Sequence, residues 1–282
     1  AYLDLSGTER LHKACPAETL ARLCRRIESE IGVTVSVGLS FHRVLAKMAS
    51  GLDKPRGFSI IGRADAAGRL DPLPVRELPG IGPAAERALA KAGIGTIGAL
   101  RRADARARIA PGAAELLAEI EAGRPGRPIA PDRPVKSVSA ETTLATDLAS
   151  VDALAAELWP LCERVSARLK ASVLAAETIQ LVLRTTDFRR INRQKSVSPP
   201  TQLAAILFET ALALLKETAD GRPYRLIGVG AAALAGADAA DRDDLLDRTR
   251  ARKANLEKAI DEVRARLGTD AITTGRGLKT HD

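Results

Sequence analysis

The first 62 residues alternate between the apolar spacing of helices and that of strands. Apolar residues at a period of about 3.6 predict a helix, and strict alternation predicts a strand with one face toward the core. On this basis we predict a strand at 2–6, a helix at 17–31, a strand at 33–40, a helix at about 42–50 capped by Ser40, and a strand at 58–61.

The next stretch, Leu78–Ile94, is punctuated by glycine and proline. Gly80 and Gly82 lie one residue apart and allow a tight turn, and Pro83 is suited to the first turn of a helix. We interpret the stretch as helix, glycine hairpin, helix, with backbone N–H groups and a helix N-terminus at its tip, where a phosphate could bind. The pattern resembles the helix-hairpin-helix, a clamp on the DNA backbone. The alternative is a Gly-Pro turn between two packed helices.

Residues 136–232 show a different pattern of apolar positions, in which short stretches typical of strands alternate with two stretches typical of helices. Strands are predicted at 136–144, 178–187, 189–197 and 224–230, and helices at about 154–169 and 203–215. The order β-α-β-β-α-β predicts a four-stranded sheet with two helices on one face.

The third of these predicted strands carries a row of cations. Arg189, Arg193 and Lys195 occupy odd positions and therefore share a face, whereas Arg190 points the other way. We expect the row to lie on the exposed side of the sheet, where it would follow a phosphate backbone. The alternative is a solvated strand face without a ligand.

Composition narrows the class of protein. The chain has 282 residues, enough for two or three domains, and its net charge of +8 favours a polyanionic partner. Its 3 cysteines have no metal-ligand spacing and are typical of a reducing compartment, so we expect a cytoplasmic protein. No apolar run reaches the length of a membrane span, and no signal peptide is visible, so no membrane partner is expected.

Five short motifs occur in the order found in one polymerase family. They are Ala1-Tyr2-Leu3-Asp4, Val35-Ser36-Val37-Gly38, Leu45-Ala46-Lys47-Met48-Ala49-Ser50, Lys54-Pro55-Arg56-Gly57 and Pro79-Gly80-Ile81-Gly82. The ordered set resembles the Y-family translesion DNA polymerases, and most closely their DNA polymerase IV (DinB) branch. The departures are His42-Arg43 in place of Asn-Lys, Gly51 in place of Asp, and Leu144 in place of Phe.

The resemblance implies an α+β fold and a division of the chain into named domains. We expect the C-terminal part of the palm at 1–64, a helical thumb with the helix-hairpin-helix at 65–123, and a proline-rich linker at 124–135. A β-α-β-β-α-β little finger follows at 136–235. The tail, 236–282, is expected to hold one helix whose apolar stripe consists of Leu256, Ile260, Val263 and Leu267.

The resemblance also assigns candidate site residues. Lys54, with Lys47 as a weaker candidate, would bind the triphosphate of an incoming deoxynucleotide, because a lysine is a compact, mobile cation. The candidates for binding primer–template DNA are Pro79, Gly80, Ile81, Gly82, Lys136, Ser137, Arg189, Arg193 and Lys195.

The metal ligands are expected outside the chain. In the resembled family an Asp-Glu pair directly precedes the first motif, so the carboxylates for Mg²⁺ are expected upstream of Ala1, and we name no catalytic or metal-binding residue here. Asp4 is then a strand-end or capping acid. A sliding-clamp contact is a further hypothesis, carried by Leu245 within the segment Arg242–Leu246.

Three functions remain open at this stage. The first is an error-prone, DNA-directed translesion polymerase, of which residues 1–282 would be a part that is inactive alone. The second is a non-catalytic accessory protein that keeps the DNA-binding domains. The third, a helix-hairpin-helix repair nuclease, would need its own carboxylate cluster, and the sequence shows none.

Overall fold

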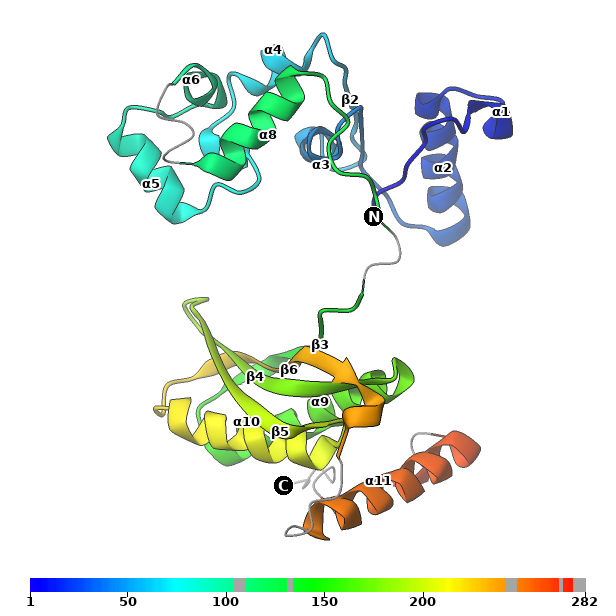
Figure 1. The fold of residues 1–282 in the computed structure, drawn as a ribbon, viewed down its shortest axis with the longest axis vertical. Helices are drawn as coiled ribbons and strands as arrows, with labels where there is room; N and C mark the ends of the chain where they lie inside the picture. The colour runs from blue at the N-terminus through cyan, green and yellow to red at the C-terminus, as the bar shows by residue number, and fades with distance from the viewer. Residues whose placement is uncertain (104–109, 131–133, 242–247, 269–270, 276–282) are drawn as a thin grey trace. The chain divides into compact units, whose positions relative to one another are not determined.

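The computed structural model describes residues 1–103, 110–130, 134–241, 248–268 and 271–275 (Figure 1). The chain divides into two compact units, Ala1–Asp132 and Arg133–Asp282. The boundary falls inside the predicted linker. Helices and sheets occur in both units, so the predicted α+β class is confirmed. In the part of the chain that the structure describes, no helix has the length and apolarity needed to cross a membrane.

The first half of unit 1 is built around a small parallel sheet. Its elements are α1 (Glu9–His12), α2 (Pro16–Ile31), β1 (Val37–Ser40), α3 (Arg43–Leu52) and β2 (Phe58–Ile61). β1 pairs in parallel with β2, and α3 forms the crossover between them and packs on both strands. The predicted helix at 17–31 and the strand at 58–61 are confirmed, whereas only the last four residues of the strand at 33–40 are paired.

Two local predictions in this half are wrong. The predicted strand at 2–6 is irregular, because the Asp4 carboxylate accepts a hydrogen bond from the Ser6 amide at 3.0 Å and no described strand pairs with the segment. The cap of α3 is His42 instead of Ser40: its Nδ1 accepts from the Val44 amide at 3.2 Å. The Ser40 hydroxyl instead donates to the Ile61 carbonyl at 2.7 Å and so links the two strands.

The second half of unit 1 is helical. Its elements are α4 (Ala66–Leu70), the 3₁₀ turn η1 (Val75–Glu77), α5 (Pro83–Lys91), α6 (Ile97–Arg102) and α8 (Pro111–Glu121). One apolar cluster joins these helices to α3 and β2, with Leu45, Ile61, Leu89 and Leu117 at 0–2% exposure. The segments predicted as palm and thumb therefore share a core in this chain.

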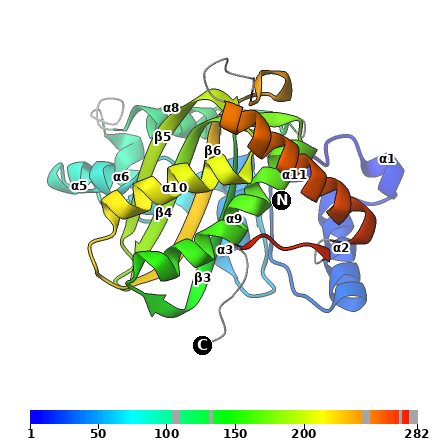
Figure 2. The ribbon, with the colours of Figure 1, turned by 90° about the horizontal axis from the view of Figure 1, so that it is seen from below.

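Unit 2 is a four-stranded antiparallel sheet covered by two helices on one face (Figure 2). In chain order the elements are β3 (Ser137–Leu148), α9 (Val151–Ala171), β4 (Leu174–Thr185), β5 (Arg190–Thr201), α10 (Ala204–Thr218) and β6 (Tyr224–Gly236). The spatial order is β3-β6-β4-β5, with every neighbouring pair antiparallel. The predicted β-α-β-β-α-β order and the single helical layer are both confirmed.

The core of unit 2 lies between the sheet and its helices. Leu158, Val165, Leu181 and Leu207 are 0–1% exposed there, and Trp159 meets Phe208 edge to face with ring centroids 5.3 Å apart. Burying large apolar side chains contributes about 1.5–3 kcal/mol each, so this interface is the main source of the unit's stability.

The tail adds the short 3₁₀ turn η2 (Ala237–Ala239) and the helix α11 (Arg248–Leu267). The expected helix is present in the tail, and of its apolar stripe Ile260 and Val263 are half-buried, whereas Leu256 is 61% and Leu267 75% exposed. α11 packs on α9 and α10 through charged side chains. The ion pairs are Lys170 with Glu257 and Asp261 at 2.9 and 2.6 Å, Lys253 with Glu209 at 2.7 Å, and Arg264 with Glu163 at 2.9 Å.

Candidate nucleic-acid interface

The glycine hairpin of unit 1 has an exposed tip on a buried base. Pro79, Gly80 and Gly82 are exposed, whereas the Ile81 side chain is buried in the core of the unit. The arm before the tip is the three-residue turn η1 and not the predicted α-helix. Ile81 therefore anchors the hairpin, and only its backbone is available to a ligand.

The hairpin leads directly into α5. Gly82 is the N-cap and has no side chain to cap the helix, and its carbonyl accepts the first helical hydrogen bond from the Glu86 amide at 2.9 Å. The amides of Ala84 and Ala85 precede that bond and therefore have no partner within the helix. Together with the helix dipole, these amides favour an anion in front of the exposed tip.

The predicted cation row of unit 2 does not lie on the exposed side of the sheet. Arg193 pairs with Leu181 and Lys195 with Ile179 across the β4–β5 ladder, and directly paired residues share a face. Leu181 and Ile179 belong to the core under the helices. Arg193 and Lys195 are thus on the helix-covered face and are exposed because β5 is an edge strand. Arg189 lies just before β5, in the turn from β4.

The opposite face of the sheet, here called the open face, carries no helix in the part of unit 2 that the structure describes. By the strand register its side chains are Ser137, Ser139, Glu141 and Thr143 of β3, Leu226, Gly228, Gly230 and Ala232 of β6, Thr178, Gln180, Val182 and Arg184 of β4, and Arg190, Asn192, Gln194 and Ser196 of β5.

The open face is mostly polar. On β6, Gly228, Gly230 and Ala232 contribute little side chain of their own, and the buried Gly228 and Gly230 lie against the neighbouring side chains of Glu141 and Gln180. Gln180 donates to Gln194 at 3.2 Å, and Arg190 pairs with Glu141 at 2.7 Å. Hydroxyl and amide groups at such a surface can donate to phosphate oxygens and base edges.

Most residues of the open face were not among the candidates that the sequence pattern indicated. Of the candidates assigned to DNA, only Ser137 lies on it, and Lys136 is exposed immediately before β3. The sequence did contain evidence for the orientation of β5, because the apolar residues Ile191 and Val197 occupy odd positions beside Arg193 and Lys195. Both pack against the core, so the odd face of β5 is the inner one.

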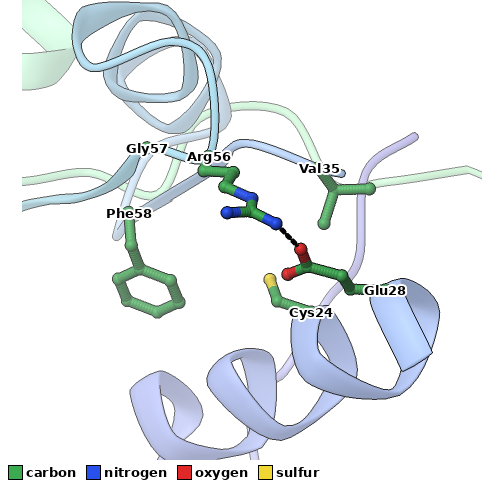
Figure 3. Close-up of a pocket in the computed structure, with 6 residues that line it drawn as sticks. All are labelled: Cys24, Glu28, Val35, Arg56, Gly57 and Phe58. Atoms are coloured by element: carbon green, nitrogen blue, oxygen red, sulfur yellow. Dashed lines mark hydrogen bonds and ion pairs between the residues drawn. The ribbon is translucent and has the colours of Figure 1, made fainter. Parts of the chain in front are cut away.

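The predicted nucleotide-binding lysines lie at and beyond α3. Lys47 is on the helix and Lys54 in the turn after it; both side chains are exposed, and neither forms an ion pair with a described residue. Arg56 of the same turn forms an ion pair with Glu28 of α2 across a cavity of about 230 Å³ (Figure 3). Both Lys54 and Arg56 are exposed, but Arg56 is paired with a carboxylate, whereas Lys54 forms no ion pair with a described residue.

The cavity itself is lined by Cys24, Glu28, Val35, Arg56, Gly57 and Phe58 (Figure 3). Burial raises the pKa of the Cys24 thiol, so the thiol stays protonated at neutral pH. A protonated thiol is a poor nucleophile and a poor metal ligand.

Among the described residues, no group of three or more His, Cys, Asp or Glu side chains is arranged to hold a metal ion.

Comparison with known proteins follows the same division of the chain. Residues 1–51 match the impB/mucB/samB family, and residues 135–245 match the impB/mucB/samB family C-terminal domain. A solved Y-family DNA polymerase chimera shares the fold, with a TM-score of 0.63 over 82% of this chain and 67% of that chain, at 21% sequence identity. By the two family matches, the chain falls in the class of impB/mucB/samB family proteins, and it has the fold of a Y-family polymerase.

Curated relatives narrow the class. The chain is 46% identical over 98% of its length to DNA polymerase IV of Brucella melitensis, spanning 62% of that protein. It is 45% identical over 99% of its length to DNA polymerase IV of Caulobacter vibrioides, spanning 70% of that protein. The chain belongs to the DNA polymerase IV family. It spans about two thirds of the length of the curated relatives that it matches.

Proposed function

We propose that this chain is the DNA- and nucleotide-binding part of an error-prone, DNA-directed translesion polymerase that acts on damaged DNA in the cytoplasm. The observation that carries the proposal is the open face, a polar, helix-free side of the sheet. The hairpin before α5 adds a second contact to the DNA backbone. The substrates are primer–template DNA and deoxynucleoside triphosphates, with Mg²⁺ as the metal. Family membership favours this activity over a non-catalytic accessory role.

The segment that would carry the sliding-clamp contact, Arg242–Leu246, lies outside the described residues. A clamp partner therefore stays a hypothesis from the sequence.

We assign to Lys54 the binding of the triphosphate of an incoming deoxynucleotide. An ammonium group on a flexible stem, free of ion pairs with described residues, is available to a cluster of phosphate oxygens. The charge on those oxygens is what a phosphoryl-transfer site has to stabilise.

A primer-extension assay tests the activity and the role of Lys54. We expect activity from a chimera that joins this chain to the part of the Caulobacter vibrioides relative that the chain does not span. Lys54→Ala should raise the KM for deoxynucleotide or lower kcat by roughly tenfold or more, as expected for one lost charged hydrogen bond. Lys13→Ala, which removes another exposed lysine of unit 1, is the control. A chimera that binds DNA but extends no primer would favour the accessory role.

Binding of the 282-residue chain to duplex DNA should be salt-sensitive and indifferent to sequence. If about five phosphates are neutralised, log K should fall against log salt with a slope of roughly −4 to −5. Arg193→Ala should reduce the steepness by about one on unrelated sequences, since its exposed guanidinium forms no ion pair with a described residue. Lys216→Ala, an exposed cation on α10, should leave the slope unchanged. A slope near zero for the wild type, or an effect of Arg193→Ala that depends on base sequence, would contradict this.

A further inference from the structure

The turn between β4 and β5 holds an aromatic side chain in an unfavourable position. Phe188 has φ +65°, in the left-handed region that bulky residues rarely adopt, and its ring is 63% exposed. The conformation is fixed by hydrogen bonds from the Phe188 amide to the Thr185 carbonyl and from the Thr185 amide to the Arg189 carbonyl, both 3.0 Å. This turn therefore has two unfavourable features, a strained backbone and an apolar ring exposed to solvent.

The ring is also positioned from one side. The guanidinium carbon of Arg225, at the start of β6, lies 4.2 Å from the centroid of Phe188. This cation–π contact orients the ring, and the large exposed fraction leaves its other face to solvent.

Cations surround this end of the sheet. Arg184, Arg189, Arg190, Arg222 and Arg225 lie at or beside the strand ends. Arg190 is paired with Glu141, and Arg222 with Asp220, whose pKa the hydrogen bond from Arg222 lowers to about 2. Arg189 is exposed and forms no ion pair with a described residue. Asp187, the acid of the same turn, accepts a hydrogen bond from the Thr185 hydroxyl, which lowers its pKa, and the neighbouring Arg189 lowers that pKa further.

Strain and exposure alone do not mark a site, as a second residue shows. Val173, in the turn from α9 to β4, also has a positive φ, +56°, and is 67% exposed. It is aliphatic and offers no face on which a base could stack. Of these two residues, only Phe188 combines an aromatic face, an orienting arginine and a neighbouring exposed cation.

We propose that Phe188, held by Arg225, stacks on an unpaired base of single-stranded DNA while Arg189 binds a neighbouring phosphate. An aromatic platform beside arginines is the chemistry that binds single strands without sequence preference, because every base has a face to stack. A paired base in a duplex already stacks on both faces and is closed to such a contact. The inference rests on the proposed function, in which DNA is the ligand. It adds an unpaired strand as a further ligand, distinct from the duplex.

The experiment measures fluorescence anisotropy of two probes, a dT oligonucleotide of about 16 nucleotides and a blunt duplex, with the whole 282-residue chain. Phe188→Gly should weaken binding of the oligonucleotide roughly 5- to 150-fold, the equivalent of one stacked base. It should leave duplex affinity unchanged within about twofold, and it should not lower the melting temperature, because glycine relieves the positive φ. Val173→Gly, the matched control, should change neither affinity.

A second variant reports stacking directly. Phe188→Trp should retain binding, and its fluorescence should be quenched by the oligonucleotide, whereas the native Trp159 is only 5% exposed and should not respond. An unchanged affinity of Phe188→Gly for the oligonucleotide, an equal loss on both probes, or no quenching of the new tryptophan would overturn the inference. Failure of the proposed function is a different result, namely that the wild-type chain does not bind the duplex.

Discussion

The Gly82→Val variant is expected to lower the melting temperature of the chain only slightly and to lose duplex DNA binding by roughly 10- to 100-fold. Gly82 has φ −91° and ψ 175°, an extended conformation open to every residue, and a Cβ built on it meets no atom within 4 Å. The valine therefore fits the fold. It also occupies the space in front of the first amides of α5, and each hydrogen bond to a charged group lost there is worth about 1.5–3 kcal/mol.

The neighbouring glycine provides the contrast. Gly80 has φ +97°, which a β-branched residue tolerates poorly, so Gly80→Val should cost about 1–3 kcal/mol of stability and lower the melting temperature. Thermal unfolding and duplex binding measured on both variants separate the two interpretations of the hairpin. If Gly82→Val loses stability and affinity in parallel, the hairpin is only a Gly-Pro turn between packed elements.

Gly38→Ala is expected to unfold unit 1. A Cβ at Gly38 would lie 2.0 Å from the Ala46 carbonyl oxygen and 2.3 Å from the Ser50 amide nitrogen. Both atoms belong to the backbone of α3, which cannot move aside without leaving β1. Overpacking that side chains can absorb costs about 1–3 kcal/mol, and a clash with backbone should exceed that range.

Calorimetry distinguishes this loss from general unfolding. Each unit has its own core, so the transition of unit 2 should be unchanged in Gly38→Ala. Gly51→Ala is the matched control, because Gly51 lies in α3 with no atom within 4 Å of an added Cβ. It should stabilise unit 1 by about 0.5–1 kcal/mol, the helix preference of alanine over glycine. A normal unit 1 transition in Gly38→Ala would show that β1 and α3 do not pack this closely.

Local patterns predicted the elements of unit 2 well because each has a long, regular apolar face. They failed for the cation row because the face of a strand depends on its register, and register is set by the turn and the partner strand. Arg193 and Lys195 were grouped correctly but assigned to the wrong side. Ile191 and Val197, two apolar residues at odd positions of the same strand, indicate that this side faces the core.

The remaining misses arose where tertiary partners decide the outcome. The apolar residues of α11 did not indicate where the helix packs, because its described ion pairs are with charged residues of α9 and α10. The cap of α3 depended on which side chain reached the Val44 amide, and the hydrogen bond to His42 Nδ1 shows that it is His42. The open face was missed for the same reason, since its polar residues form a surface only once four strands are aligned.

The ionic attachment of α11 has a consequence for the dynamics of unit 2. Ion pairs near the surface contribute little net stability, whereas the sheet and its two helices are joined by a continuous apolar core. The lowest-energy opening of this unit is therefore the release of α11 as a body, with the sheet intact. Amide protons of α11 should then exchange with solvent through a local equilibrium that added salt accelerates, while those of the central strands β4 and β6 exchange only when the whole unit unfolds.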